Sequence, residues 1–280
     1  GRGDAFIEKY LSNPRHIEVQ IVADKYGNVI HLAERDCSIQ RKHQKVVEIA
    51  PSPRLNDAVR KELLRTSKKA MIKLGYESVG TVEYLVDEDD NFYFIEMNTR
   101  VQVEHTITEA ISGVDIIYRM IRIAEGQKLP FMQEDIKFRG YAIEFRINAE
   151  DPKNGFIPSS GRIRTYLSPG GPGVRMDSIG HKDYVVPTNY DSMIGKLIVT
   201  GLDWDGVVRK SRRALDEFII AGIPTNIPLH REIVRDIDFQ EGVFNTTYLD
   251  KKLPTFTMEA IQHIEEDEAK HERIAAIALA

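Results

Sequence analysis

The chain has 280 residues, of which 42% are hydrophobic and 29% are charged, an ordinary balance for a globular protein that can bury a sizeable core. The formal net charge is −5 and no basic block is present, which argues against nucleic acid as a partner. No apolar run approaches the roughly 20 residues that span a bilayer, so we expect no membrane partner.

The cysteine content and the first residues bear on where the protein works. The chain has one cysteine, Cys37, which cannot form an internal disulfide, and this favours a reducing, cytoplasmic compartment. A small core or strand residue is the commoner role for such a cysteine, and a thiol nucleophile is the rarer one. The sequence begins Gly1-Arg2-Gly3 without a signal-peptide pattern, and we expect it to be the interior of a longer protein.

The first predicted elements are three strands. Residues 17–23 alternate in polarity, a turn cluster follows at 24–28, and residues 29–35 are predicted to return as the second strand of a hairpin. A third strand is predicted over 40–49, because the prolines that follow, the first of them Pro51, stop it.

A helix is predicted next along the chain. Asn56 can cap its N-terminus, and Gly75 suits the left-handed position that follows a helix C-terminus. Apolar residues recur between them at helical spacing, namely Val59, Leu63, Leu64, Met71 and Leu74.

A second hairpin is predicted around the acidic turn 87–91. If this turn is symmetric, Glu83 faces Glu96 on one side of the sheet and Tyr84 faces Ile95 on the other. Like charges that face each other across a sheet are destabilising, so the first pair needs an explanation. The two predicted strands are Val79–Val86 and Phe92–Met97.

A divalent cation between the two facing carboxylates would remove that penalty. Hard oxygen ligands suit Mg2+ or Mn2+, and Asn98 adds a carboxamide oxygen on the same face as Glu96. The alternative is a solvated acidic face, where water screens Glu83 from Glu96. The hairpin alone leaves both interpretations open.

The polar row continues beyond this hairpin. Every second residue from Glu96 to Glu104 is polar, while the intervening residues are mostly apolar and can face a core. If the segment is extended, this row spans roughly 26 Å, which is enough for nucleotide phosphates at one end and a second substrate at the other. The row consists of Glu96, Asn98, Arg100, Gln102 and Glu104.

The remaining elements are predicted from periodicity and turn residues. A helix is predicted over 115–125, and the character of the sequence changes near residue 138. Residues 141–147 then alternate cleanly as a strand. The glycine-rich loop at 170–173 could be a phosphate-binding nest, but a plain turn is favoured because no helix start follows it.

Helical periodicity returns towards the end of the chain. A helix is predicted over 205–221 with Gly222 as its stop, and a polar terminal helix over 258–280.

Five separate motifs follow one another along the chain: residues 8–11 with 14–16 (EKYL, PRH), 34–46 (ERDCSIQRKHQKV), 96–105 (EMNTRVQVEH), 146–151 (RINAED) and 190–196 (YDSMIGK). In sequence and order they resemble the signatures of biotin carboxylases, which belong to the ATP-grasp superfamily. The similarity covers about residues 1–250. Other ATP-grasp ligases share the paired acids and Asn98, but they are not expected to share the full 96–105 run.

This resemblance implies an α+β (or α/β) fold in three parts. Residues 1–137 would be the C-terminal half of an ATP-grasp domain. Residues 138–250 would be a biotin carboxylase C-terminal domain, with a mixed sheet and flanking helices, and 251–280 a C-terminal helical tail.

The resemblance also assigns roles to individual residues. The adenine would be held by Glu8, Lys9 and Leu11, and the ribose and phosphate side would be lined by His16, Gln40 and His43. The metal ions that bridge ATP phosphates would be held by Glu83, Glu96 and Asn98. Bicarbonate would be held by Lys45, Arg100, Gln102 and the backbone of Val103, with Glu104 as the base that deprotonates it. Arg146 would lie at the ureido oxygen of biotin.

The implied activity is the ATP- and bicarbonate-dependent carboxylation of biotin through carboxyphosphate. Its substrates would be ATP with Mg2+ or Mn2+, bicarbonate, and biotin on a carrier protein or domain. A carboxyltransferase component would use the product, and the whole enzyme would be a homodimer. Taken singly, His16, His43, Lys45 and Arg146 would each suit an ordinary surface, core or strand position; the motif context favours the functional roles.

Two departures from the family pattern qualify these expectations. Thr106 follows the Glu104-His105 pair, where the family often has proline, which removes a fixed φ but no ligand. The family's ATP-contacting lysines and glycine-rich lid precede the matching segment and are absent here, so we expect the chain alone to be inactive. The alternatives are another ATP-grasp ligase, which joins a carboxylate to an amine, and a non-enzymatic assembly or dimerisation module.

Overall fold

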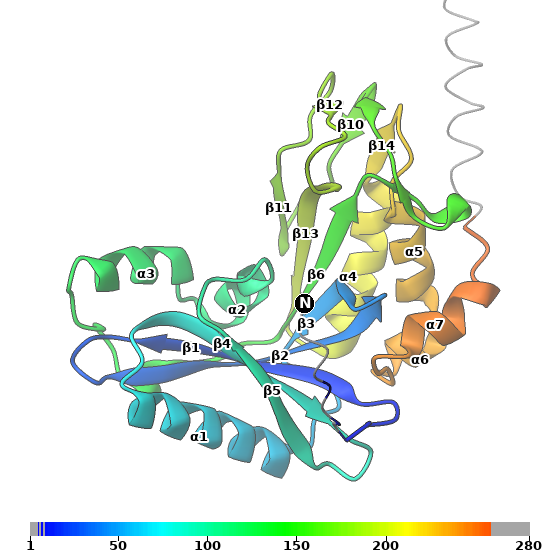
Figure 1. The fold of residues 1–280 in the computed structure, drawn as a ribbon. Helices are drawn as coiled ribbons and strands as arrows, with labels where there is room; N and C mark the ends of the chain where they lie inside the picture. The colour runs from blue at the N-terminus through cyan, green and yellow to red at the C-terminus, as the bar shows by residue number, and fades with distance from the viewer. Residues whose placement is uncertain (1–4, 6, 8, 259–280) are drawn as a thin grey trace, which may run out of the picture. The chain divides into compact units, whose positions relative to one another are not determined.

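The computed structural model describes residues 5, 7 and 9–258, which divide into two compact units. The first unit comprises the residues up to 138 together with 244–249, and the second comprises 139–243 with the residues from 250 onward. Figure 1 labels the elements of both. No helix in the described part of the chain is long and apolar enough to cross a membrane.

Five antiparallel strands form the sheet of the first unit, in the order β3-β2-β1-β4-β5. The predicted strands are confirmed, but β2 runs on past its predicted end at residue 35. The third strand begins later than predicted because Lys42 and His43, both with positive φ, form the turn before it. The strands are β1 (Arg15–Ala23), β2 (Val29–Arg41), β3 (Gln44–Ala50), β4 (Ser78–Val86) and β5 (Phe92–Asn98).

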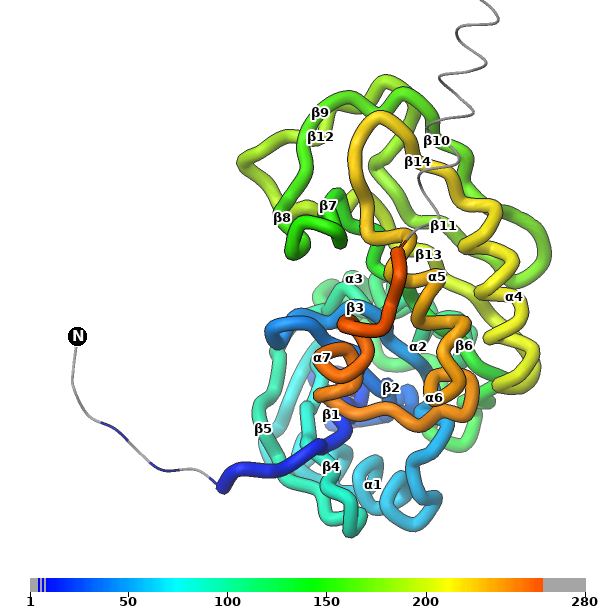
Figure 2. The backbone as a smooth tube through the Cα atoms, turned by 90° about the vertical axis from the view of Figure 1, so that its right-hand side faces the viewer, coloured from blue at the N-terminus to red at the C-terminus, as the bar shows by residue number. Residues whose placement is uncertain are grey.

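One face of this sheet is covered by α1 (Asp57–Leu74), as Figures 1 and 2 show. Leu63 and Met71 of α1 pack with Ile17 and Val19 of β1 in a buried apolar cluster. The predicted caps of this helix are confirmed. Asn56 accepts a hydrogen bond from the backbone N–H of Ala58, and Gly75 is left-handed with φ 60°.

Two shorter helices, α2 (His105–Ser112) and α3 (Ile116–Ala124), follow β5. Ile116 and Ile123 of α3 pack with Val22 of β1 in a second apolar cluster. Side chains alternate across a strand, so Val22 and the other even-numbered residues of β1 share this face of the sheet. The predicted helix over 115–125 is confirmed, with Asp115 as its N-cap. A short 3₁₀ turn, Gln133–Asp135, comes after it.

The register of the second hairpin is confirmed at Glu83 and Glu96, which are directly opposed. The predicted pairing of Tyr84 with Ile95 is wrong, because the register shifts between Glu83 and Tyr84 and Tyr84 pairs with Phe94. One extra residue in β5 is a β-bulge, and it leaves Ile95 44% exposed.

The extended polar row predicted as far as Glu104 is also wrong beyond Asn98. Strand β5 ends there, residues 99–104 are irregular, and α2 begins at His105. The backbone carbonyl of Gln102 accepts a hydrogen bond from the backbone N–H of His105 (3.3 Å) and contacts its Nδ1 (2.8 Å), which turns the chain. Thr106 lies buried in the first turn of α2.

The second unit contains an antiparallel sheet in the order β11-β13-β6, and helices packed near it. Every strand pair described in this unit is antiparallel, so the mixed sheet expected here is not found among the described residues. Together with the first unit, these strands and helices confirm the α+β class. The main elements are β6 (Tyr141–Asn148), β11 (Val174–Ser178), β13 (Met193–Gly201), α4 (Trp204–Glu217), α5 (Ile227–Arg235) and α6 (Ile237–Gln240). The minor strands are β7 (Glu150–Asp151), β8 (Ile157–Pro158), β9 (Gly161–Arg162), β10 (Thr165–Leu167), β12 (Val185–Val186) and β14 (Ile219–Ala221). The remaining short helices are 3₁₀ Pro152–Asn154, α7 (Tyr248–Lys252) and 3₁₀ Leu253–Thr255.

The helix predicted over 205–221 ends at Glu217, and residues 219–221 form β14, which pairs with β10. Gly222 is therefore not a helix stop. Its φ is 102°, and an added Cβ would lie 2.5 Å from the backbone oxygen of Arg162, so the close approach of two chain segments requires glycine. Of the helix predicted over 258–280, only Met258 lies within the described residues.

Candidate functional site

Three buried carboxylates of the first unit gather around one lysine. Glu18 of β1 and Glu83 of β4 are direct cross-strand neighbours, and Glu104 immediately precedes α2. Lys45 of β3 contacts all three: its Nζ lies 2.8 Å from Glu18 Oε2, 3.4 Å from Glu83 Oε1 and 2.6 Å from Glu104 Oε1. The even positions of β1 and the odd positions of β4 point to the same face, which is why distant parts of the sequence meet here.

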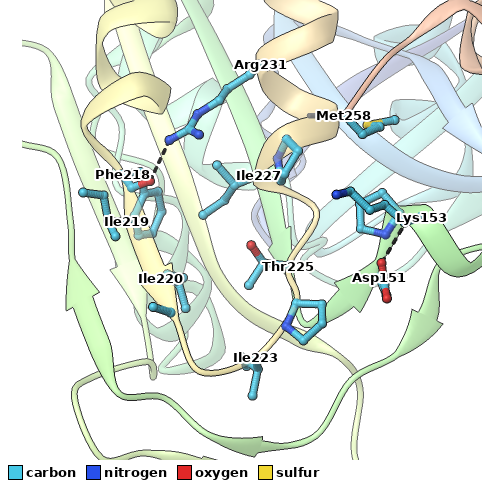
Figure 3. Close-up of a pocket in the computed structure, with 14 residues that line it drawn as sticks. Asp151, Lys153, Phe218, Ile219, Ile220, Ile223, Thr225, Ile227, Arg231 and Met258 are labelled. Atoms are coloured by element: carbon cyan, nitrogen blue, oxygen red, sulfur yellow. Dashed lines mark hydrogen bonds between the residues drawn. The ribbon is translucent and has the colours of Figure 1, made fainter. Parts of the chain in front are cut away.

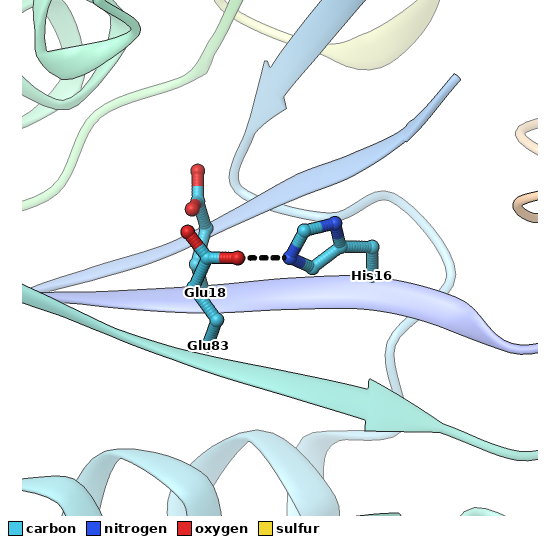
Figure 4. A group of neighbouring side chains, drawn as sticks. All are labelled: His16, Glu18 and Glu83. Carbon is cyan, nitrogen blue, oxygen red and sulfur yellow. Dashed lines mark hydrogen bonds and ion pairs between the residues drawn. The ribbon is translucent and has the colours of Figure 1, made fainter. Parts of the chain in front are cut away.

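A histidine extends the cluster along β1. Figure 4 shows His16, Glu18 and Glu83 pointing toward one another. The Nδ1 atom of His16 lies 2.6 Å from the amide nitrogen of Gln40, which can only donate. The proton of a neutral His16 therefore sits on Nε2, 2.7 Å from Glu83 Oε2, where it donates to the carboxylate.

His16, Glu18 and Glu83 each offer one ligand atom within 4.8 Å of the others, a spacing that could hold a metal ion. The ammonium group of Lys45 contacts both of these carboxylates. A protein cation therefore already pairs with two of these three residues.

Two amide side chains complete the environment of Glu83. Asn98 Nδ2 lies 2.9 Å from Glu83 Oε1 and 3.0 Å from Glu96 Oε1, and it donates to both. Gln102 Nε2 donates to the same Glu83 oxygen at 2.7 Å. Glu83 is buried whereas Glu96 is exposed, so the pair has one side open to solvent.

The contacts of Glu83 and Glu18 keep these two carboxylates ionised. Burial alone would raise the pKa of Glu83, but hydrogen bonding from His16 and the charge of Lys45 outweigh it and lower the pKa to about 2. Burial likewise opposes ionisation of Glu18, where Arg35 and Lys45 lower the pKa to about 2. The pKa of Lys45 is raised, since its neighbouring anions outweigh the effect of its own burial.

Cys37 is fully buried beside this cluster and donates its thiol hydrogen to Glu18 Oε1 at 2.7 Å. Burial and the charge of Glu18 raise its pKa well above the usual value, so the thiol stays protonated. The prediction of a core residue is confirmed.

The remaining predicted site residues of the first unit form no described hydrogen bond with Lys45 or with the three buried carboxylates around it. Arg100 is exposed and donates to the backbone oxygen of Val101 at 3.2 Å, and His43 is exposed in the turn between β2 and β3. Lys9 Nζ donates to the Tyr93 hydroxyl at 2.7 Å and lies 4.5 Å from the centre of its ring. Leu11 and Val103 are half-buried. Glu8 lies outside the described residues.

Arg146 belongs to the second unit, on β6 opposite Lys196 of β13. Its backbone oxygen accepts hydrogen bonds from Asn226 Nδ2 and His230 Nε2, both at 2.8 Å. His230 is fully buried, and burial lowers its pKa to about 4, so the ring is neutral at pH 7. Two side chains at the start of α5 therefore fix the backbone at Arg146.

Sequence reasoning missed Glu18 and Arg35. Glu18 stands as a charged residue between Ile17 and Val19, in a row whose other members, His16 and Gln20, are also polar. That break in an apolar strand is the signal that could have identified it. Arg35 gave no signal of its own, since one arginine among charged neighbours is ordinary in an exposed strand.

A separate cavity of about 200 Å3 lies in the second unit, where Figure 3 shows Arg231 reaching from α5 toward Phe218. The cavity contains none of the predicted site residues. Arg231 donates to the backbone oxygens of Leu215 (2.9 Å) and Phe218 (3.1 Å), so its charge stabilises the end of α4. The carboxylate cluster is therefore the candidate site. The apolar part of the cavity wall includes Phe218, Ile219, Ile220, Ile223 and Ile227.

Two families match the chain in succession. The family described as carbamoyl-phosphate synthase L chain, ATP binding domain, matches residues 1–132, and the family described as biotin carboxylase C-terminal domain matches residues 144–251.

Curated relatives match across both units. The chain is 52% identical over 253 residues to a biotin carboxylase of Pseudomonas aeruginosa, which covers 90% of this chain and 56% of that protein. It is 54% identical over 251 residues to the small subunit of the 2-oxoglutarate carboxylase of Hydrogenobacter thermophilus, which covers 90% of this chain and 53% of that protein. The chain thus spans about half the length of the curated relatives it matches.

A solved structure with the same fold is the biotin carboxylase domain dimer of the Hydrogenobacter thermophilus 2-oxoglutarate carboxylase, in complex with MgADP, ADP and bicarbonate. It is 53% identical to this chain, with a TM-score of 0.87 over 89% of this chain and 55% of that chain.

Proposed function

Because the chain belongs to the biotin carboxylase family, we propose that it supplies the metal-binding, bicarbonate-binding and biotin-facing residues of an enzyme that carboxylates biotin with ATP and bicarbonate. The observation that carries this proposal is that the ammonium group of Lys45 contacts three buried carboxylates, those of Glu18, Glu83 and Glu104. A water-poor site with ionised carboxylates and fixed cations suits a reaction in which anions must meet.

We assign residues 1–137 to an ATP-grasp part, 138–250 to a C-terminal domain and 251–280 to a tail. The two compact units and the two successive family matches support the division near residue 138.

Bicarbonate is a poor nucleophile until it loses its proton, and Glu104 is the base we assign to that step. Its carboxylate is almost fully buried, and Lys45 Nζ lies 2.6 Å from Oε1. A carboxylate held this way can take a proton from a bound substrate, while the neighbouring ammonium group stabilises the anion that results. Arg100, Gln102 and the backbone N–H of Val103 would complete the bicarbonate site.

One oxygen of the deprotonated bicarbonate then attacks the γ-phosphorus of ATP, and ADP leaves. The product, carboxyphosphate, breaks its bond between carbon and the bridging oxygen to give CO2 and phosphate. Phosphate takes the N1 proton of biotin, and the biotin nitrogen attacks CO2. Positioning and neutralisation of charge dominate such phosphoryl transfers, which suits a site rich in fixed cations.

Glu83, Glu96 and Asn98 are the residues we assign to Mg2+ or Mn2+. Oxygens of the two carboxylates converge on the single nitrogen of Asn98, and a half-turn of that amide would present its oxygen instead, so the donor set fits a hard cation. When bound, the metal neutralises the charge of the ATP phosphates.

Biotin is assigned to Arg146. As its ring nitrogen loses the proton, negative charge gathers on the ureido oxygen, and a guanidinium group stays protonated throughout. The hydrogen bonds from Asn226 and His230 to the Arg146 backbone support a fixed position for this cation.

The nucleotide is assigned to residues at the start of the chain and at the β2–β3 turn. Glu8, Lys9 and Leu11 would hold the adenine, and His16, Gln40 and His43 the ribose and phosphate side. The hydrogen bond from Gln40 to His16 joins two of these residues and links them to Glu83.

The partners we propose are a biotinylated carrier and a carboxyltransferase component, with a homodimer of the whole enzyme. The solved relative described as a biotin carboxylase domain dimer supports the last of these.

A coupled ATPase assay on the full-length protein tests this function. ATP cleavage should require bicarbonate and Mg2+, and free biotin should accelerate it. Cleavage that needs an amine and a carboxylate substrate, and that ignores biotin, would instead identify a different ATP-grasp ligase.

A further inference from the structure

We propose that Arg35 is a positioning residue that fixes the orientation of the Gln102 carboxamide and thereby sets the affinity for bicarbonate. The inference rests on the proposed function, because bicarbonate is the ligand we assign to Gln102. It concerns a residue that would not touch the substrate itself.

Arg35 of β2 is fully buried and links five side chains. An arginine has five N–H donors in a rigid plane, and each has an acceptor here. Nε donates to Glu18 at 3.0 Å, Nη1 to Gln20 (2.7 Å) and Thr108 (3.0 Å), and Nη2 to Thr81 (3.2 Å) and Gln102 (2.7 Å).

These contacts decide which way the Gln102 amide faces. Its Oε1 accepts from Arg35 Nη2, and its Nε2 donates to Glu83 Oε1 at 2.7 Å. In the opposite orientation, the amide N–H groups would meet a guanidinium and the amide oxygen would meet a carboxylate. Both contacts would be repulsive, so Arg35 and Glu83 together select one orientation.

The selected orientation suits an anionic substrate. One N–H of the Gln102 amide is used by Glu83, and the second remains as the donor we assign to bicarbonate. Gln102 lies in the irregular segment 99–104, where no strand ladder holds it. Arg35 ties this segment to β1, to β4 through Thr81 and to α2 through Thr108. A pre-oriented donor binds its anion without paying the entropy of fixing a loose side chain.

Arg35→Lys tests the inference, because lysine keeps the charge but has only three donors on one nitrogen. In the full-length protein, the KM for bicarbonate in ATP cleavage should rise about tenfold, which corresponds to the loss of one charge-assisted hydrogen bond. The KM for ATP should change less than about twofold, because none of the described hydrogen bonds of Arg35 goes to a residue assigned to the nucleotide.

A positioning role of Arg35 differs from a purely structural one in that the effect of Arg35→Lys on the bicarbonate KM should depend on the presence of Gln102. In a Gln102→Ala background, Arg35→Lys should add less than about a twofold change to the bicarbonate KM. Arg60→Lys is the matched control: Arg60 is partly buried against Glu34 and the Ser52 backbone oxygen, and its replacement should leave the ratio of the two KM values unchanged.

Thr108→Val keeps the inference testable if Arg35→Lys fails to fold. It removes one acceptor of Arg35 without touching Gln102, and it should raise the bicarbonate KM about threefold with little change for ATP. Equal increases in both KM values, or effects that add fully to those of Gln102→Ala, would overturn the inference while the proposed function stands. ATP cleavage by the unmodified protein that is indifferent to bicarbonate would overturn both.

Discussion

Glu18 and Glu83 are directly opposed on β1 and β4, and the ammonium group of Lys45 lies 2.8 Å from one and 3.4 Å from the other. Facing carboxylates repel each other, yet both are ionised with a pKa of about 2. The guanidinium group of Arg35 pairs with Glu18, and the ammonium group of Lys45 pairs with both carboxylates, so protein cations offset this repulsion. The site is therefore preorganised by cations from the protein itself.

Replacing Lys45 with methionine should destabilise the protein strongly. The change leaves buried carboxylates without their shared cation, and the free energy of unfolding at pH 7 should fall by about 3–5 kcal/mol. Adding Glu18→Gln should recover part of the loss, because it removes one of the unpaired charges. Urea denaturation of the three proteins measures this, with Lys61→Met on the exposed side of α1 as the control. A loss no greater than that of the control would contradict the account.

Glu96→Gln should weaken metal activation. Glu96 is exposed and accepts a hydrogen bond from Asn98, and no cation among the described residues pairs with it, whereas Lys45 pairs with Glu83. Turnover should fall by about a hundredfold or more, and the Mg2+ concentration needed for half-maximal ATP cleavage should rise. Glu88→Gln in the hairpin turn is the matched control. Unchanged metal activation in the Glu96 variant would remove this residue from the metal site.

Glu104 and Arg146 should act at different steps. Glu104→Gln should abolish bicarbonate-dependent ATP cleavage and biotin carboxylation together, since both need deprotonated bicarbonate. Arg146→Ala should keep appreciable bicarbonate-dependent cleavage while biotin carboxylation falls by about a hundredfold or more. Parallel assays of phosphate release and carboxybiotin formation measure the two activities. If both variants lose both activities in equal proportion, the division of roles is wrong.

Stability should fall on acidification in two successive windows. His230 is buried and His31 is half-buried, and this removal from solvent lowers the pKa of each from 6.5 to about 4. Between pH 6.5 and 4 the unfolded chain therefore binds more protons than the folded chain, so stability decreases as the pH falls. For Glu18 and Glu83, whose folded pKa is about 2 against 4.5, the same reasoning gives a further decrease between pH 4.5 and 2.

Urea denaturation across pH 7 to 4 measures the first of these windows. His31→Phe should flatten the dependence there, with each histidine contributing roughly 1–3 kcal/mol. An unchanged slope in this variant would show that His31 titrates normally in the folded protein.

The hairpin illustrates what local patterns can predict. Turn symmetry correctly placed Glu83 opposite Glu96, because register over a few residues depends on the turn. The same rule failed one residue later at Tyr84, because a bulge leaves no distinct mark in the sequence. The alternation of polar and apolar residues likewise predicted an extended segment as far as Glu104, whereas the chain turns at Gln102 and α2 starts at His105.

The site shows a second limit. Glu104 and Lys45 were predicted from family motifs and Glu83 from the register of the hairpin, and the structure brings them together. Glu18 left a signal, a charged residue in an apolar strand, but Arg35 could not be predicted, because its importance depends on contacts between residues far apart in the sequence. An arginine with all five donors satisfied is recognisable only after β1, β2, β4 and α2 are assembled around it.

The central claim is that this site activates bicarbonate through carboxyphosphate, and an isotope measurement tests it most directly. The full-length protein is supplied with ATP, Mg2+ and bicarbonate labelled with 18O, and the released phosphate is analysed by mass spectrometry before the label exchanges with water. If a bicarbonate oxygen attacks the γ-phosphorus, that oxygen stays on phosphorus when CO2 departs. Each phosphate should then carry one 18O atom, and Glu104→Gln should suppress the labelled product. Phosphate that is formed at the same rate without label would show that water, not bicarbonate, is the nucleophile, and would contradict the account.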